Sequence, residues 1–85
     1  MKKVIKFYAN WCGPCQVYTP NFKHVTDQLK GWDVEEYDID TPGGKSAAVF
    51  YKVVSIPTTV ILVDSEEPRI IKGALSIEKL AQELI

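Results

Sequence analysis

The hydrophobic and polar positions of the chain follow two periods, one typical of strands and one typical of helices. Residues 4–9 are almost continuously apolar and aromatic, interrupted only by Lys6, which predicts a strand covered on both faces. Residues 34–40, 58–64 and Arg69–Lys72 predict three further strands. Residues 58–64 are the clearest of these, because they are β-branched and apolar.

Three other stretches repeat their apolar residues at helical spacing. After the first strand an apolar stripe at intervals of four, three and four predicts a helix that Pro20 kinks and Gly31 ends. A shorter helix is expected at residues 45–53, after a turn at residues 41–44. Ser76 is expected to cap a last helix. The first and last stripes consist of Tyr18, Phe22, Val25 and Leu29, and of Ile77, Leu80, Ala81 and Leu84.

The elements follow one another in the order β-α-β-α-β-β-α, which predicts a single α/β domain over residues 1–85. The first two strands are expected to be parallel, because a helix connects them, and the last two antiparallel, because their connection is short. The prediction is a four-stranded mixed sheet flanked by helices.

Composition excludes several classes of protein. The chain has 85 residues, of which 46% are hydrophobic and 25% charged, and its formal net charge is -1. This net charge lacks the excess of positive charge that is typical of nucleic-acid-binding proteins. No apolar run approaches the roughly 20 residues of a membrane-spanning helix. Lys6 interrupts the apolar run that would follow Lys2 and Lys3 in a signal peptide. We therefore expect a cytoplasmic monomer without nucleic-acid or membrane partners.

The two cysteines, Cys12 and Cys15, enclose Gly13 and Pro14 at the junction of the first strand and the first helix. A thiol at a helix N-terminus faces unpaired backbone N–H groups and the positive end of the dipole, which stabilise a thiolate. Cys12 is therefore expected to be the exposed nucleophile that attacks a disulfide. Cys15, one turn into the helix, is expected to be shielded and to resolve the mixed disulfide.

Three other interpretations of the cysteine pair were weighed against thiol–disulfide exchange. A zinc site needs two further ligands, and His24 is the only histidine, so no metal is expected. A structural disulfide across so short a loop adds little stability. The third interpretation is a coincidental, inert pair, but the position of the cysteines between a strand and a helix argues against this interpretation. Thiol–disulfide exchange remains the favoured interpretation.

Four stretches of the chain resemble the thioredoxin family. Phe7-Tyr8-Ala9-Asn10-Trp11-Cys12-Gly13-Pro14-Cys15 is similar to the active-site stretch of that family, and Pro20 matches its helix-kinking proline. Ile56-Pro57-Thr58 resembles its cis-proline segment, and Gly73-Ala74-Leu75-Ser76 the stretch before its last helix. The matches keep their order through essentially the whole chain. The first strand and helix of the family have no counterpart, so an architecture as compact as that of a glutaredoxin is expected.

The resemblance implies a thioredoxin-like fold and roles for particular residues. Cys12 would be the attacking thiolate and Cys15 the resolving thiol. The peptide bond before Pro57 would be cis and packed against the cysteines, and the backbone of Ile56 would pair with an extended substrate segment. The apolar docking surface around Cys12 would consist of Trp11, Gly13, Pro14, Ile56, Gly73 and Ala74.

Lys6 and Glu36 depart from the family pattern. Thioredoxins have an Asp beneath the cysteines at the position of Lys6, and a Lys at the position of Glu36. We expect a charge-swapped pair, in which a protonated Lys6 favours the thiolate of Cys15 and Glu36 serves as the proton acceptor. The alternative is that Lys6 extends along an edge of the sheet to solvent.

These features predict a thioredoxin-type enzyme that reduces protein disulfides by dithiol exchange. No cofactor motif is present, so the electrons are expected from a partner, and the resemblance implies a thioredoxin reductase. One alternative is a glutaredoxin-like enzyme that uses glutathione, although Gly73-Ala74-Leu75-Ser76 lacks the Asp that such enzymes use to hold the tripeptide. Another is a non-catalytic subunit or binding module of a larger complex.

Overall fold

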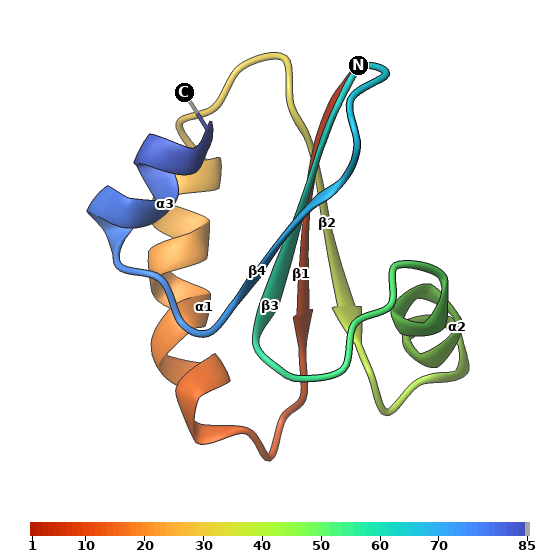
Figure 1. Cartoon of the computed structure of the whole chain (residues 1–85). Coiled ribbons are helices and arrows are strands. Elements are labelled where there is room, and N and C mark those ends of the chain that lie inside the picture. The colour runs from red at the N-terminus through yellow and green to blue at the C-terminus, as the bar shows by residue number, and fades with distance from the viewer. Residues whose placement is uncertain (85) are drawn as a thin grey trace.

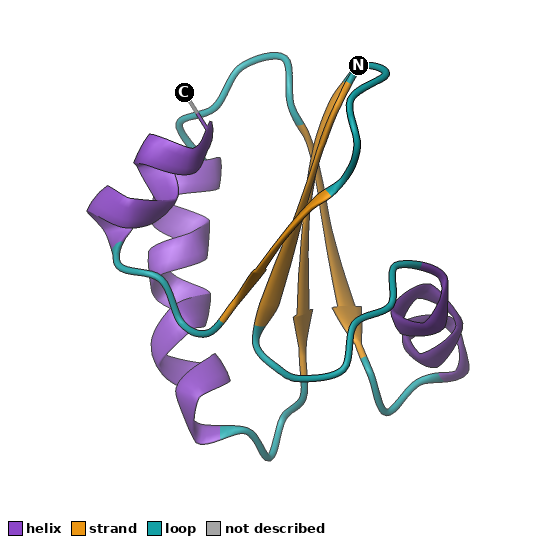
Figure 2. Cartoon of the chain, in the orientation of Figure 1, coloured by secondary structure: helices purple, strands orange, loops and turns teal. Residues whose placement is uncertain are grey.

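The computed structural model describes residues 1–84 and contains the predicted order of elements, β-α-β-α-β-β-α (Figure 2). The strands are β1 (Lys2–Tyr8), β2 (Asp33–Asp38), β3 (Thr58–Val63) and β4 (Arg69–Lys72). The helices are α1 (Gly13–Thr26), α2 (Pro42–Phe50) and α3 (Ile77–Leu84). No helix among residues 1–84 is both long enough and apolar enough to cross a membrane.

The four strands form one mixed sheet in the order β2-β1-β3-β4. The β1 and β2 strands are parallel, whereas β3 is antiparallel to both β1 and β4. Both predictions of strand direction are therefore confirmed. The carboxyl ends of β1 and β2 lie at the same edge of the sheet, and the loop into α1 starts there (Figure 1).

Helices cover the two faces of the sheet unequally: α1 and α3 lie side by side on one face, and α2 lies alone on the other (Figure 1). The alternation of side chains along β1 separates two buried clusters. Val4 packs with the helical stripes of α1 and α3, while Ile5 and Phe7 pack towards α2. All members of the predicted stripes pack in this cluster, although Leu29, Ile77 and Ala81 are only partly buried. The buried members are Val4, Tyr18, Phe22, Val25, Ile61, Leu80 and Leu84.

The first helix ends earlier than the sequence predicts. It stops at Thr26, whose hydroxyl donates to the carbonyl oxygen of Phe22 at 2.8 Å, and not at Gly31. The residues that follow form turns, in which the N–H of Leu29 donates to the carbonyl of Thr26. Gly31 has a φ of +78°, which a glycine adopts readily, so this residue serves the turn into β2 instead of the helix end.

The second helix starts three residues earlier than predicted. The stretch at residues 41–44 is its N-cap and first turn, because the Thr41 hydroxyl accepts from the N–H of Gly44 at 3.0 Å. Pro42 suits the first helical position, because a backbone N–H at that position would have no hydrogen-bond partner within the helix. Gly44 is required there, because a Cβ would lie 1.8 Å from the carbonyl oxygen of Asp38.

The last helix begins as predicted. The hydroxyl of Ser76 accepts a hydrogen bond of 3.1 Å from the backbone N–H of Lys79. Ser76 is therefore the N-cap, and Glu78 in the first turn lies near the positive end of the helix dipole.

Candidate functional site

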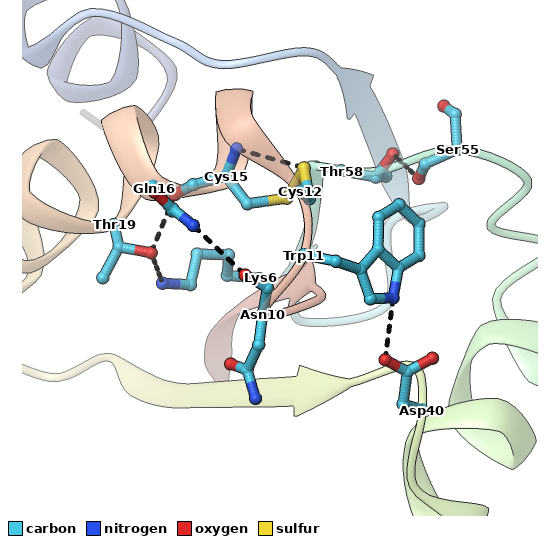
Figure 3. Close-up of a disulfide and its surroundings, with 10 residues drawn as sticks. All are labelled: Lys6, Asn10, Trp11, Cys12, Cys15, Gln16, Thr19, Asp40, Ser55 and Thr58. Atoms are coloured by element: carbon cyan, nitrogen blue, oxygen red, sulfur yellow. Dashed lines mark hydrogen bonds between the residues drawn. A yellow bond between two sulfur atoms is a disulfide. The ribbon is translucent and has the colours of Figure 1, made fainter.

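The cysteine pair lies at the start of α1, just beyond the carboxyl end of β1 (Figure 3). Cys12 and Cys15 are joined in a disulfide, with their Cα atoms 5.2 Å apart. Cys12 is the N-cap residue, and its sulfur accepts a hydrogen bond of 3.1 Å from the backbone N–H of Cys15. One first-turn N–H group of α1, that of Cys15, thus points at the sulfur of Cys12, and such a donor stabilises a thiolate.

Burial differs between the cysteines less than the sequence predicts. Cys12 is 5% exposed and Cys15 1% exposed, so the expectation of an exposed Cys12 is wrong for the disulfide form. Cys12 and Cys15 pack with Ala9, and the partly buried Tyr8, Ile39 and Ile56 lie against this cluster. Cys12 keeps the greater access of the two, because it precedes the helix and Cys15 lies inside its first turn.

The segment beside the cysteines contains a cis peptide bond between Ile56 and Pro57, as the family resemblance implies. Pro57 is buried, and its carbonyl oxygen accepts a hydrogen bond of 2.9 Å from the N–H of Gly73. Gly73 has a φ of +96°, in the left-handed region. The hydroxyl of Thr58 donates to the carbonyl of Ser55 at 2.7 Å (Figure 3). The structure therefore brings Ile56, Pro57 and Gly73 together from two separate stretches of sequence.

The remaining residues of the expected docking surface are exposed. Gly13 and Pro14 lie in the first turn of α1, and Ala74 follows Gly73 after β4. Trp11 is 68% exposed, and its indole N–H donates to a carboxylate oxygen of Asp40 at 2.8 Å (Figure 3). Sequence reasoning missed Asp40. The available indication was its place at the carboxyl end of the predicted second strand, since that edge of a parallel sheet also carries the cysteines.

A hollow of about 590 Å³ extends from Trp11 and Ile56 towards α2. Its walls are mostly aliphatic and come from α2 and the loop after it. The sequence prediction did not include these residues, because it interpreted the second helix only as a cover for the sheet. The remaining lining residues are Ile39, Lys45, Ala48, Val49, Val53, Val54 and Ser55.

Lys6 and Glu36 are directly opposed in the parallel register of β1 and β2. The ammonium of Lys6 lies 2.7 Å from a carboxylate oxygen of Glu36 and donates to the hydroxyl of Thr19 at 2.8 Å. It also lies 5.0 Å from the ring centre of Tyr8 and 5.2 Å from that of Phe22. The Lys6 side chain is 1% exposed and that of Glu36 50% exposed. The alternative of a solvent-directed Lys6 is therefore wrong.

Thr19 connects this ion pair to Cys15, the cysteine that the sequence predicts to resolve the mixed disulfide. Its hydroxyl donates to the carbonyl oxygen of Cys15 at 2.9 Å while it accepts from Lys6 (Figure 3). A cavity of about 300 Å³ is lined by Lys6, Glu36, Thr19 and Cys15 together, with Tyr8, Ala9, Asn10 and Gln16. Sequence reasoning missed Thr19, which lies four residues after Cys15 and so on the same face of α1.

Among residues 1–84, no three His, Cys, Asp or Glu side chains are grouped so as to hold a metal ion.

The whole chain matches a family model described as Thioredoxin, over residues 1–85. A thioredoxin of Mycoplasmoides gallisepticum is 38% identical over 65 residues, which cover 76% of this chain and 63% of that protein. Thioredoxin Y1, chloroplastic, of Arabidopsis thaliana is 35% identical over 81 residues, which cover 95% of this chain and 46% of that protein. The chain thus spans about half to two-thirds of the length of these relatives.

The fold is also similar to that of solved structures. The X-ray structure of Fasciola hepatica thioredoxin matches with a TM-score of 0.84 and 29% sequence identity. The match covers 98% of this chain and 77% of that chain. The four-stranded sheet and its three helices are therefore found together in a known protein.

Proposed function

Because the chain belongs to the thioredoxin family, we propose that it is a thiol–disulfide oxidoreductase that reduces protein disulfides through Cys12 and Cys15. The observation that carries the proposal is the position of the pair. Cys12 caps α1 and accepts a backbone hydrogen bond at its sulfur, and Cys15, the less accessible of two buried cysteines, lies inside the first turn. This is the asymmetry that two successive exchange steps require.

In the first step, the thiolate of Cys12 attacks one sulfur of the client disulfide. A new bond forms between Cys12 Sγ and that sulfur, and the other client sulfur leaves as a thiolate that takes a proton from water. In the second step, Cys15 loses its proton and attacks Cys12 Sγ. The mixed disulfide breaks, and the second client sulfur leaves as a thiolate that takes up a proton equivalent to the one that Cys15 lost. The client gains two electrons and two protons, and the protein is left with the Cys12–Cys15 disulfide.

The client would bind over the surface around Cys12. In this proposal the backbone of Ile56 pairs with an extended client segment, and Pro57 positions that backbone beside the cysteines. Trp11, which Asp40 holds by a hydrogen bond, forms one wall of the hollow next to Ile56. The rest of the apolar surface consists of Gly13, Pro14, Gly73 and Ala74.

The protein needs a partner to return its disulfide to the dithiol form. We propose a reductase of the thioredoxin reductase type as that partner, with a monomeric protein acting in the cytoplasm. The support is the family, since an exchange protein of this kind receives its electrons through the same cysteine pair.

The proposal is tested by turnover of a protein disulfide such as insulin, with dithiothreitol as the reductant. The Cys12→Ser variant should lose the acceleration entirely. When the reduced Cys15→Ser variant is mixed with the protein disulfide after removal of dithiothreitol, it should stop after the first step and accumulate a mixed disulfide that mass spectrometry detects. Since neither substitution removes a core packing group of appreciable size, circular dichroism should show both variants folded.

Two outcomes would overturn this function. Turnover sustained by glutathione better than by a thioredoxin reductase would favour the glutaredoxin-like alternative. Full biological activity of a variant that lacks both cysteines would favour a binding module. The reduction potential of the Cys12–Cys15 pair distinguishes the glutaredoxin-like alternative, because a thioredoxin-type pair is more reducing than a glutaredoxin-type pair. A difference of 30 mV corresponds to about 1.4 kcal/mol for a two-electron couple and is readily measured.

A further inference from the structure

The β2 strand is an outer strand of the sheet, and one of its long sides has no neighbouring strand. The sheet has the order β2-β1-β3-β4, so within residues 1–84 only β1 pairs with β2 (Figure 1). The backbone N–H and C=O groups of successive residues point to opposite sides of a strand, so an outer strand leaves those of every second residue unpaired. Such groups are a template on which another chain can form a further strand.

Val34 and Glu36 present their backbone groups to the open side of β2. The N–H of Ile39 donates to the carbonyl oxygen of Tyr8 on β1 at 3.0 Å. Alternate residues counted back from Ile39 therefore bond to β1, and the residues between them face outward. The carbonyl of Asp38 agrees with this assignment, because it accepts a hydrogen bond of 3.1 Å from the turn before α2. The open edge thus consists of the N–H and C=O groups of Val34 and Glu36 and the N–H of Asp38.

A hollow lies beside this edge, on the face of the sheet that α1 covers. Its volume is about 200 Å³, and the side chains of Val34 and Glu36 line it together with the buried Phe22 of α1. Lys23 and Asp27 also line it and pair with each other at 3.0 Å. Val34 is 41% exposed. A strand added to β2 would place every second side chain over this hollow, where an apolar side chain would contact Val34 and Phe22.

The charge of β2 distinguishes between the possible occupants of its edge. All four charged side chains of the strand are acidic. Lysines of β1 pair with Glu35 at 3.1 Å and with Glu36 at 2.7 Å, whereas no ion pair within residues 1–84 includes Asp33 or Asp38. A second copy of β2 would bring like charges opposite each other, which destabilises a strand pair. The complementary occupant is a basic segment.

We propose that the open edge of β2 binds an extended, basic segment of another protein, which adds a fifth strand to the sheet. Backbone hydrogen bonds to Val34 and Glu36 hold the segment. Its side chains alternate, with apolar residues over the hollow and lysine or arginine on the opposite face, where Glu35 lies. The inference goes beyond the proposed function, because it uses none of the residues that exchange disulfides.

An occupant of this edge does not cover the cysteines. They lie beyond the carboxyl end of β1, which is the inner neighbour of β2. A strand added to the far side of β2 would lie about 10 Å from β1, since neighbouring strands are about 4.8 Å apart. The segment therefore acts as a tether, which keeps a partner protein beside the exchange site and leaves that site free.

The first experiment measures binding of a fluorescein-labelled peptide, Lys-Val-Lys-Val-Lys-Val-Lys, by fluorescence anisotropy. The peptide has no cysteine and so forms no mixed disulfide. We expect saturable binding that weakens at least about threefold when NaCl rises from about 0.05 M to about 0.5 M, because salt screens the attraction between charges. The peptide Glu-Val-Glu-Val-Glu-Val-Glu should not bind. Equal binding of the two peptides, or no binding of either, would overturn the proposal.

Val34→Pro tests the backbone pairing directly. The substitution removes the outward N–H of residue 34 and no hydrogen bond to β1, and an outer strand tolerates proline at such a position. Val34→Thr is the matched control, because it keeps both the N–H and the branched side chain. The Kd of the lysine peptide should rise about tenfold in Val34→Pro and less than about twofold in Val34→Thr. The same Kd in both variants would contradict strand addition.

Two N-methylated peptides repeat this test on the unsubstituted protein, and they replace it if circular dichroism shows that Val34→Pro does not fold. One peptide carries methyl groups on the amides of its valines, and the other on the amides of its inner lysines. Only alternate amides of an added strand face β2, so one peptide should lose binding and the other should keep it. Equal affinity of the two methylated peptides would overturn the proposal.

Insulin turnover separates this edge from the client surface around Cys12. A saturating concentration of the lysine peptide should leave the rate of insulin reduction unchanged. Inhibition that follows occupancy would place the peptide over the cysteines and overturn the proposal. Analytical ultracentrifugation tests the other occupant, since a dimer that Val34→Pro dissociates would put a second copy at this edge and also overturn it. A protein that binds the peptide but reduces no disulfide would contradict the proposed function and leave this inference standing.

Discussion

The backbone N–H of Gly73 donates a hydrogen bond of 2.9 Å to the carbonyl oxygen of Pro57. This bond joins the end of β4 to the segment that lies beside the cysteines, and it depends on the backbone conformation of Gly73, whose φ is +96°. A residue with a side chain adopts that conformation only at a cost.

Substitution of Gly73 by Ala should lower the free energy of unfolding by about 1–2 kcal/mol, the cost of a side chain in the left-handed region. Urea denaturation measures this loss in the free energy of unfolding. Gly13→Ala is the control, because Gly13 lies in a helix and no atom lies within 4 Å of its added Cβ. Equal stability of the two variants would show that the conformation of Gly73 contributes nothing.

Substitution of Gly44 by Ala should be more damaging. The added Cβ would lie 1.8 Å from the carbonyl oxygen of Asp38, which is backbone and cannot rotate away. We expect a loss of more than about 2 kcal/mol, with α2 displaced from β2. Gly43→Ala, one residue earlier in the same helix and with no atom within 4 Å, should instead be neutral or stabilise by up to about 1 kcal/mol. Thermal melts of the two variants distinguish these outcomes directly.

Stability should fall at alkaline pH because of Tyr18. Burial raises the pKa of Tyr18 to about 12, above the ordinary value of 10 that applies in the unfolded chain. The folded state therefore holds the proton between pH 10 and pH 12 while the unfolded state loses it, and the free energy of unfolding decreases across that window. The decrease from this group approaches about 2.7 kcal/mol.

The Tyr18→Phe variant isolates that contribution, because every other ionisable group is the same in both proteins. At pH 7 it should be less stable by about 1 kcal/mol, since Thr59 loses its partner at 2.6 Å. The difference between the two proteins should then shrink or reverse towards pH 12. Parallel curves over the whole range would be inconsistent with a protonated Tyr18 in the folded state.

Loss of the Trp11–Asp40 hydrogen bond should weaken client reduction without weakening the fold. Asp40→Ala removes an exposed bond of 2.8 Å, and we expect kcat/KM for insulin to fall about fivefold, equivalent to about 1 kcal/mol. Asp33→Ala removes the same charge from the other end of β2 and should have no such effect. A similar fall in both variants would indicate long-range attraction of the client and not the position of Trp11.

The sequence predicted the order of elements and the apolar stripes because periodicity is a local property. It also located the cysteine pair at a strand–helix junction, where the chemistry of a helix N-terminus follows directly. It did not predict the start of α2. Pro42 and two glycines resemble a turn until the hydroxyl of Thr41 is seen to cap the helix and Asp38 is seen to exclude a larger residue at Gly44.

The sequence by itself determined the fold class and the position of Cys12 and Cys15, since both depend on residue type and spacing. The expectation that Lys6 and Glu36 are neighbours came from the resemblance to the thioredoxin family. Only the tertiary structure decided which groups meet across those elements. Register placed Lys6 opposite Glu36, α1 buried the ammonium beneath Thr19, and β4 brought Gly73 to Pro57. The physical reason is that burial and hydrogen bonding of a side chain depend on residues distant in the chain, which local periodicity does not contain.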